Sequence, residues 1–177
     1  MNRLFLLLSS LFLASCQTIG PEFSSLEPAI DNRAKVYFIR ATNSFGSARS
    51  INIHIDGKLF AELDNRRFTI ANLEPGLHEF KQSFNPMFGD MEFMHETRKI
   101  EARLEAGKIY YVSFHMSPGS GPPQEPLLIQ TGVPGLFLPL SYKLPNISFG
   151  FIEEQSALSE LSWCYYSYPN KSTSPEK

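Results

Sequence analysis

The sequence predicts a small antiparallel β-sandwich with one short helix near its C-terminus. Aromatic residues make up 13% of the 177 residues, including 15 Phe and 7 Tyr, and aromatic rings pack well on the pleated surface of a sheet. Apolar and polar residues alternate from Ile51 to Asp56, as in a strand with one buried face. Candidate strands recur at intervals of about 8 to 12 residues with turn signals between them, a spacing typical of sandwiches.

The composition is that of an ordinary globular protein. Hydrophobic residues account for 42% of the chain and charged residues for 19%, and the formal net charge is −2. A chain of this length can bury the core of one domain but is short for two. No cluster of Lys and Arg is present to neutralise phosphates, so the sequence argues against nucleic-acid binding.

The N-terminus has the pattern of a secretion signal. Arg3 supplies a positive charge, and the apolar run at residues 4–13 is too short to cross a bilayer. The run leads into LASC at residues 13–16, which resembles the lipobox of bacterial lipoproteins. This resemblance implies a signal peptide over residues 1–15, diacylglyceryl transfer to the Cys16 sulfur, and acylation of the new amine with a fatty acid such as palmitate. Gln17, where an Asp would favour retention in the inner membrane, implies the outer membrane.

The chain has two cysteines, Cys16 and Cys164. If Cys16 carries lipid, Cys164 has no partner, and we expect it to be buried, because free cysteine is among the most buried residue types. If LASC is instead the end of an ordinary signal peptide, the two cysteines are free to pair in a disulfide.

We expect a lipid-anchored linker at residues 16–33, where Gly, Pro and Ser occur without helical or strand periodicity. The sandwich domain then covers residues 34–168, beginning with a mostly buried strand at 34–41. Asp56-Gly57 is the strongest hairpin signal in the chain. A two-residue loop would set Ile53 opposite Phe60, but the neighbouring apolar residues would then fall on the other face. A bulge or another register is therefore the alternative.

The remaining turns and strands follow similar signals. Pro75-Gly76 and Gly107 mark turns that can require a positive φ. At the C-terminal end we expect a strand at 147–152, then a helix from Glu153 to about Leu161 with Ala157, Leu158 and Leu161 on one side, then a last strand within CYYSYP. Residues 169–177 are expected to form a disordered tail.

Several of these segments together resemble a known family. Their order is AKVYFIRA, INIHIDGKLFAEL, FTIANLEPGLHEF and LEAGKIYYVSF, between Ala34 and Phe114. It resembles the bacterial lipoprotein family catalogued as domain of unknown function 2846. It is also similar to PEGA-type surface-layer modules, which share the DG…PG-H pattern. The resemblance implies a small Ig/PEGA-like β-sandwich on a lipid anchor, without a described activity.

The proline-rich insertion at residues 117–145 departs from the family pattern. Prolines exclude it from central strands, yet much of it is apolar. Three interpretations remain open. The insertion covers an open sheet edge, it docks a protein partner, or it inserts Leu136, Phe137 and Leu138 into a membrane face. These three residues are the candidate partner contacts.

The sequence predicts no catalytic residues, no metal site and no cofactor. The four histidines lack metal-ligand spacing, and the GxSxG, P-loop and GxGxxG motifs are absent. We therefore expect a non-catalytic binding or scaffolding module of the cell envelope, held at the membrane by lipid on Cys16 and contacting an envelope protein. The alternatives are a structural accessory of a larger complex and an envelope hydrolase acting on lipid or peptidoglycan. The hydrolase would need His54, His78 or His115 beside a carboxylate in one pocket.

Overall fold

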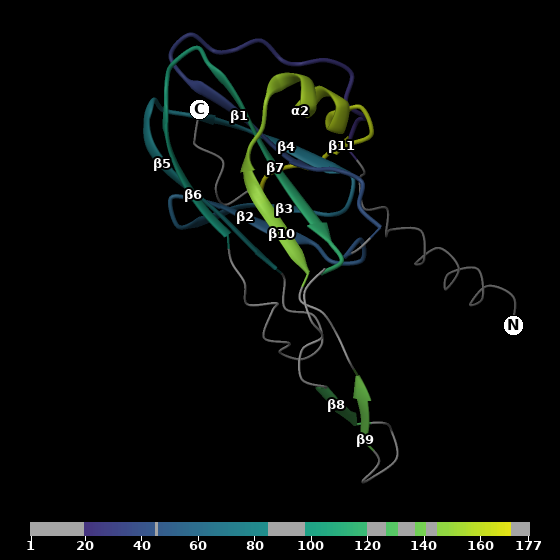
Figure 1. The fold of residues 1–177 in the computed structure, drawn as a ribbon. Helices are drawn as coiled ribbons and strands as arrows, with labels where there is room; N and C mark the ends of the chain where they lie inside the picture. The colour runs from purple at the N-terminus through teal and green to yellow at the C-terminus, as the bar shows by residue number, and fades with distance from the viewer. Residues whose placement is uncertain are drawn as a thin grey trace, which may run out of the picture.

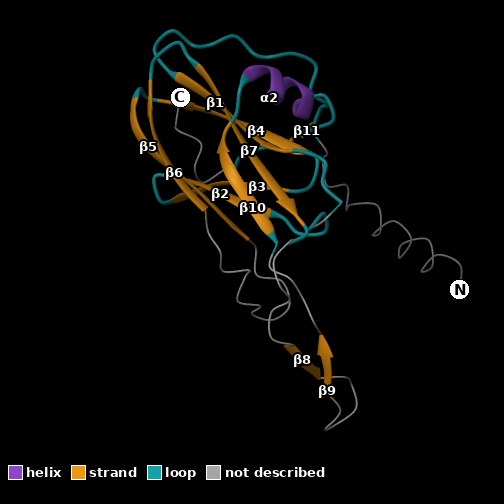
Figure 2. Cartoon of the chain, viewed as in Figure 1, coloured by secondary structure: helices purple, strands orange, loops and turns teal. Residues whose placement is uncertain are grey.

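The computed structural model describes residues 20–44, 46–84, 98–119, 127–130, 137–140 and 145–170. The elements in chain order, shown in Figures 1 and 2, are β1 (Ala34–Arg40), β2 (Ile51–Ile55), β3 (Lys58–Leu63), β4 (Arg67–Leu73), β5 (Gly76–Phe84), β6 (Arg98–Leu104), β7 (Ile109–Ser117), β8 (Leu127–Gln130), β9 (Phe137–Leu140), β10 (Asn146–Phe151), α2 (Glu154–Leu161) and β11 (Tyr165–Tyr166). Within these ranges, no helix has both the length and the apolar character needed to cross a membrane.

Two sheets pack face to face, which confirms the predicted sandwich. One has five strands in the order β10-β7-β1-β4-β11, and the other has four in the order β3-β2-β5-β6. The five-stranded sheet is mixed, because β1 runs parallel to β7 and β4 runs parallel to β11. A tight turn cannot join parallel neighbours. The chain therefore passes through the four-stranded sheet between β1 and β7.

The main core lies between the two sheets. Ile51, Ile53 and Ile55 of β2 all point into it, which confirms the predicted alternation. Phe38 of β1 and Phe80 of β5 meet across the core with ring centroids 5.4 Å apart. The core draws on both sheets, so its burial joins strands that are far apart in the sequence.

A second core lies on the outer face of the five-stranded sheet, under α2. It contains Tyr37, Ile39, Phe68, Tyr111, Ala157, Leu161 and Cys164. With both faces of the sheet covered, every residue of β1 is buried, as predicted for a mostly buried strand. Of the three residues expected on one side of α2, Ala157 and Leu161 are buried and Leu158 is 37% exposed. Ala157 and Leu161 are four residues apart and share one face of the helix, whereas Leu158 is turned towards its rim.

The β2–β3 hairpin has the predicted turn and a bulge. Asp56 and Gly57 both have positive φ, at 49° and 77°, as a two-residue type I′ turn requires. The register shifts between Ile53 and His54, so that Ile53 lies opposite Ala61. The bulge lets Phe60 and Ala61 both be buried, which resolves the conflict noted in the sequence.

Residues 20–33, which the sequence assigns to the linker, lie along the outside of the sandwich. The Phe23 amide donates to the Cys164 carbonyl over 3.0 Å. The Lys35 ammonium, only 3% exposed, lies 2.8 Å from a carboxylate oxygen of Glu27. The chain is thus in contact with the domain from Gly20 onward, four positions after Cys16.

The proline-rich insertion leaves and re-enters the sandwich at one point. Ser117 at the end of β7 pairs with Asn146 at the start of β10, so the insertion extends a connection between neighbouring strands. Within it, β8 and β9 form a separate two-stranded antiparallel sheet. Phe137 and Leu138 belong to β9 and pair with Gln130 and Ile129. Leu136 lies outside the described residues.

Two residues of the expected tail are described. The Asn170 amide donates to the Phe60 carbonyl over 2.9 Å, which brings the chain beyond β11 back to the four-stranded sheet. The rest of the tail, residues 171–177, falls outside the described ranges.

Candidate functional site

The histidines that the hydrolase alternative would use take part in three separate contact networks. His54 on β2 contacts the Ser83 hydroxyl, His78 on β5 contacts Asp56, and His115 on β7 contacts Glu160. His95 and the predicted lipid attachment residue Cys16 lie outside the described residues. Among the described residues, no group of three or more His, Cys, Asp or Glu side chains could hold a metal ion.

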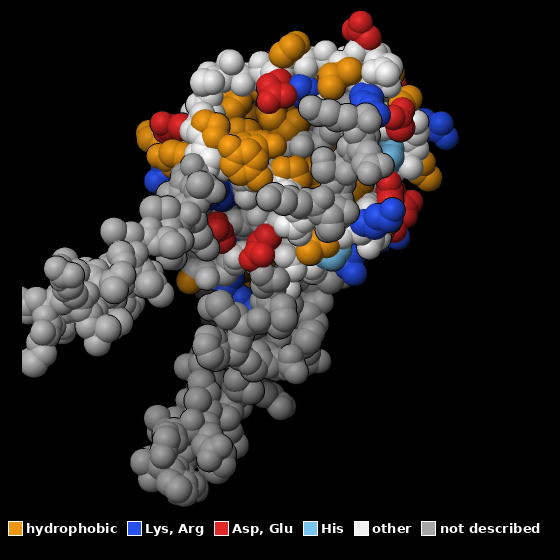
Figure 3. All heavy atoms as spheres, turned by 180° about the vertical axis from the view of Figure 1, so that it is seen from behind, with side chains coloured by type: hydrophobic (Ala, Val, Ile, Leu, Met, Phe, Trp, Pro, Cys, Tyr) orange, Lys and Arg blue, Asp and Glu red, His pale blue; other side chains and the backbone are white. Residues whose placement is uncertain are grey.

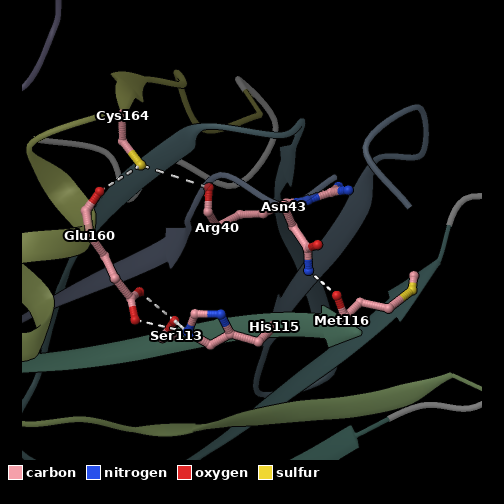
Figure 4. Close-up of polar contacts among 7 residues, drawn as sticks. All are labelled: Arg40, Asn43, Ser113, His115, Met116, Glu160 and Cys164. Carbon is pink, nitrogen blue, oxygen red and sulfur yellow. Dashed lines mark hydrogen bonds and ion pairs between the residues drawn. The ribbon is translucent and has the colours of Figure 1, made fainter. Parts of the chain in front are cut away.

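The network most like a catalytic site joins Ser113 and His115 of β7 to Glu160 of α2, and we call these three residues the polar cluster. Figure 4 shows Glu160 reaching from the helix to both side chains on the strand. The Ser113 hydroxyl donates to one Glu160 oxygen over 2.6 Å, and His115 Nε2 lies 2.8 Å from the other. His115 Nε2 also lies 3.0 Å from the Ser113 oxygen. Tyr111 and Ser113 are two positions apart on β7 and therefore lie on the same face of the strand. Tyr111 belongs to the core under α2, so the polar cluster lies on the outer face of the sheet.

The hydrogen-bond directions of the polar cluster differ from those of an activated serine. A nucleophilic serine donates to an unprotonated imidazole nitrogen, and the carboxylate holds the other ring nitrogen. Here the serine donates to the carboxylate itself, and the carboxylate faces the same Nε2 that approaches the serine. Ser113 is also only 2% exposed. The arrangement suits a structural role, in which hydrogen bonds to Glu160 hold α2 against β7.

We expect the stability contribution of the polar cluster to depend on pH. The hydrogen bond to Glu160 raises the pKa of His115, against the lowering effect of partial burial, and the negative charge of Glu160 adds to the rise. A raised pKa in the folded state means that the pair stabilises the fold fully below about pH 6.5, the value of an unperturbed histidine. The stabilisation is lost as the pH rises through the raised pKa.

We expect the stability advantage of the wild type over His115→Gln to shrink between about pH 6 and pH 8. Since the His115 side chain is 47% exposed, the change should stay below about 1 kcal/mol. Urea unfolding at several pH values measures it. His54→Gln is the control with the opposite sign, because burial, helped by Lys81, lowers the pKa of His54. A wild-type advantage over His115→Gln that is independent of pH would contradict the assignment.

Cys164 is the buried thiol that the sequence predicts. It is 0% exposed, and burial, reinforced by the charge of Glu160, raises its pKa to about 12. Its sulfur lies 3.3 Å from the Glu160 carbonyl and 3.7 Å from the Arg40 carbonyl (Figure 4). A protonated thiol in this position is a poor nucleophile and a poor disulfide partner.

A second network explains the DG…PG-H pattern. His78 lies with Nδ1 2.7 Å from an Asp56 carboxylate oxygen and Nε2 2.8 Å from the Glu74 carbonyl. The other Asp56 oxygen accepts the Glu79 amide. The aspartate of the first turn is thus bound to the strand that follows the second turn, where Gly76 has φ 149°. This network holds two turns together. The order of its residues is visible in the sequence, but their contact is not.

The contacts of this network lower the pKa of Asp56. Burial alone would raise its pKa, but the Glu79 amide and His78 outweigh burial and lower it. The carboxylate is therefore held in its charged form, as a residue that fixes a turn requires.

Comparison with known proteins identifies the family and leaves the activity open. A search of curated proteins finds no match, and a search of solved structures finds none. The family model described as "Protein of unknown function (DUF2846)" matches residues 30–125. This range contains β1 to β7, the DG…PG-H network and both strand residues of the polar cluster. The chain belongs to the DUF2846 family.

Proposed function

We propose that this protein is a lipid-anchored module of the bacterial cell envelope, held at the outer membrane, that acts by binding or scaffolding and without catalysis. The observation that carries the proposal is LASC at residues 13–16, placed at the end of an apolar run of signal-peptide length. Each buried acyl CH₂ contributes about 0.8 kcal/mol, and more than one chain is needed for stable anchoring. The anchor would concentrate the domain at the membrane and so strengthen weak contacts with an envelope partner.

The state of Cys164 supports this use of Cys16. Cys164 is fully buried, and its sulfur lies against two backbone carbonyls. A thiol packed in this way without a disulfide agrees with a Cys16 that carries the lipid implied by the motif.

The contacts of the histidines support a binding role over hydrolysis. The Glu160 carboxylate accepts a hydrogen bond from the Ser113 hydroxyl, and the Asp56–His78 pair fixes two turns. For contact with an envelope protein we propose the insertion at 117–145, including Leu136, Phe137 and Leu138. It is joined to the sandwich at the end of β7, so it can be engaged without disturbing the core.

The test compares three full-length chains expressed in a two-membrane bacterium: wild type, Cys16→Ala and the matched control Cys164→Ala. Intact-mass spectrometry and membrane fractionation are the readouts. We expect wild type and Cys164→Ala to begin at residue 16, to carry a lipid mass and to sediment with the outer membrane. We expect Cys16→Ala to carry no lipid and to lose this association.

Thiol alkylation makes the test stricter. With Cys16 in a thioether, the wild type should react with one equivalent of alkylating reagent, and only after unfolding, since Cys164 is buried. A mature chain without lipid, or a disulfide between the two cysteines, would overturn the proposed anchor.

A further inference from the structure

The N-terminal segment enters the folded domain beside β11, at the edge of the five-stranded sheet. The Tyr166 amide donates to the Pro21 carbonyl over 2.8 Å, and Glu22 forms a β-bridge with Tyr165. A Cβ on Gly20 would come within 2.3 Å of the Tyr166 carbonyl oxygen, so the two backbones are in direct contact. The position of Gly20 is thus fixed at this edge.

The chain before Gly20 limits how far this edge can lie from a lipid on Cys16. Gly20 is four positions after Cys16, and a fully extended chain spans at most about 3.6 Å per residue. The Cα of Gly20 can therefore lie no more than roughly 14 Å from the Cα of the residue that carries the lipid. A tether of this length holds one particular side of the domain close to the headgroup layer.

The side chains on this edge are suited to a membrane–water interface. Trp163 and Tyr168, which flank β11, are each 63% exposed, and Trp and Tyr favour the interface because one end of each ring system is apolar and the other polar. Arg66 and Arg67 both lie over the Tyr165 ring, at 5.6 and 5.9 Å from its centroid. Guanidinium groups in this position can bind lipid phosphates.

Hydrophobic side chains gather on one part of the surface. Figure 3, seen from behind, shows them on the side of the domain where Figure 1 places β4 and β11. Exposed aromatic groups that lie together mark an interaction surface more often than isolated ones do.

We propose that the β11 edge, defined as Trp163, Tyr165, Tyr168, Arg66 and Arg67, rests on the lipid headgroups of the membrane that holds the anchor. The proposal rests on the proposed lipid at Cys16 and adds an orientation to it. Addition of a partner strand at β11 is the less suitable use, because residues 21–23 already bond to the backbone of 164–166. Trp163 and Tyr168 stay largely exposed on this edge, which the short tether holds near the anchor.

The chain carries its own reporter, since Trp163 is its single tryptophan. The experiment places the full-length lipidated protein in vesicles of phosphatidylethanolamine and phosphatidylglycerol, with and without lipids brominated on their acyl chains. We expect the Trp163 emission to shift to the blue in vesicles and to lose intensity with brominated lipids. Intact mass is measured on the same sample to verify the lipid.

The matched control moves the tryptophan to another side of the domain. In Trp163→Phe/Leu77→Trp the only indole lies at a position 65% exposed on β5, at an odd-numbered site that points away from the core side occupied by Phe80. Its emission should be unaffected by brominated lipids. Arg67→Glu should weaken the quenching of Trp163 at low ionic strength without changing the lipid mass.

The outcomes separate the orientation from the anchor. Quenching of Trp163 but not of the control indole supports the proposal. A lipidated protein in which the two tryptophans are quenched equally, or not at all, overturns the orientation and leaves the anchor intact. Shielding of Trp163 from soluble iodide that grows with protein concentration, without quenching by brominated lipid, assigns the edge to a second copy of the chain and also overturns it. Absence of the lipid overturns both proposals.

Discussion

Replacing Phe80 by alanine is expected to lower the free energy of unfolding by about 3 to 5 kcal/mol. Phe80 is 0% exposed and joins the two sheets. Its ring lies 5.4 Å from that of Phe38 on β1 and 6.1 Å from that of Phe151 on β10. Truncation removes both edge-to-face contacts and leaves a cavity in a core that can close only partly.

The measurement is urea unfolding followed by far-UV circular dichroism, with Leu77→Ala as the matched control. Leu77 lies on the same strand but is 65% exposed, so its truncation should change the stability by no more than about 0.5 kcal/mol. Domains of this kind have a total stability of about 5 to 15 kcal/mol, so the Phe80 variant should show a clearly lower midpoint. Equal effects at the two positions would mean that Phe80 does not join the sheets.

Most of the sandwich was predictable because its signals are local. The alternation at Ile51, Ile53 and Ile55 defines a buried face within five residues. The Asp56-Gly57 and Pro75-Gly76 turns have backbone conformations that few other residue pairs adopt without strain. Each of these features depends on neighbours in the sequence, and the family resemblance rests on the same residues.

Features that depend on residues far apart in the chain were harder to predict from the sequence. The parallel pairing of β1 with β7 joins segments about 70 residues apart, and no local pattern specifies it. Residues 20–33 lack periodicity because they lie on the domain without forming a long strand, yet Phe23 packs against its outer core. The bulge at Ile53 was one of two alternatives, since the sequence indicated a conflict but not its solution.

The polar cluster and the turn network show the same limit. Glu160 is 45 residues from His115 and 47 from Ser113, and Asp56 is 22 residues from His78. No motif joins Glu160 to Ser113 or His115, because these residues become neighbours only when the helix packs on the sheet. Asp56 and His78 belong to the DG…PG-H pattern, but the pattern does not show that they are in contact. The alternation of Tyr111, Ser113 and His115 on β7 was the one available signal, since it places three polar-tipped residues on one face.

Arg40 is a polar residue whose burial the sequence did not indicate. It ends a strand in which every residue is buried, and it is itself 2% exposed. One guanidinium nitrogen donates to the Leu63 carbonyl over 2.8 Å, and the other donates to the Gly46 carbonyl over 2.9 Å. Burial lowers its pKa to about 10, although the charge of Asp64 opposes the change.

We expect Arg40→Ala to destabilise the domain by about 3 to 5 kcal/mol. The substitution removes the side-chain donor from two carbonyl groups and opens a cavity beside Phe114, whose ring centroid lies 5.7 Å from the guanidinium carbon. It also releases the loop after β1, because the carbonyl of Gly46 is one of the two acceptors. Urea unfolding of the variant measures the loss.

Arg40→Lys separates the effect of the two guanidinium hydrogen bonds from the effect of the positive charge. A lysine keeps the positive charge but has a single ammonium group, which cannot reproduce the two directed bonds of a planar guanidinium. We expect a loss of about 1 to 3 kcal/mol, because a single ammonium group loses one of the two directed hydrogen bonds while it stays buried. A lysine variant as stable as the wild type would show that charge alone is sufficient. If the lysine and alanine variants were equally unstable, the paired geometry of Arg40 would account for the whole contribution, because it is the guanidinium fork that links β1 to the end of β3 and to the loop at Gly46.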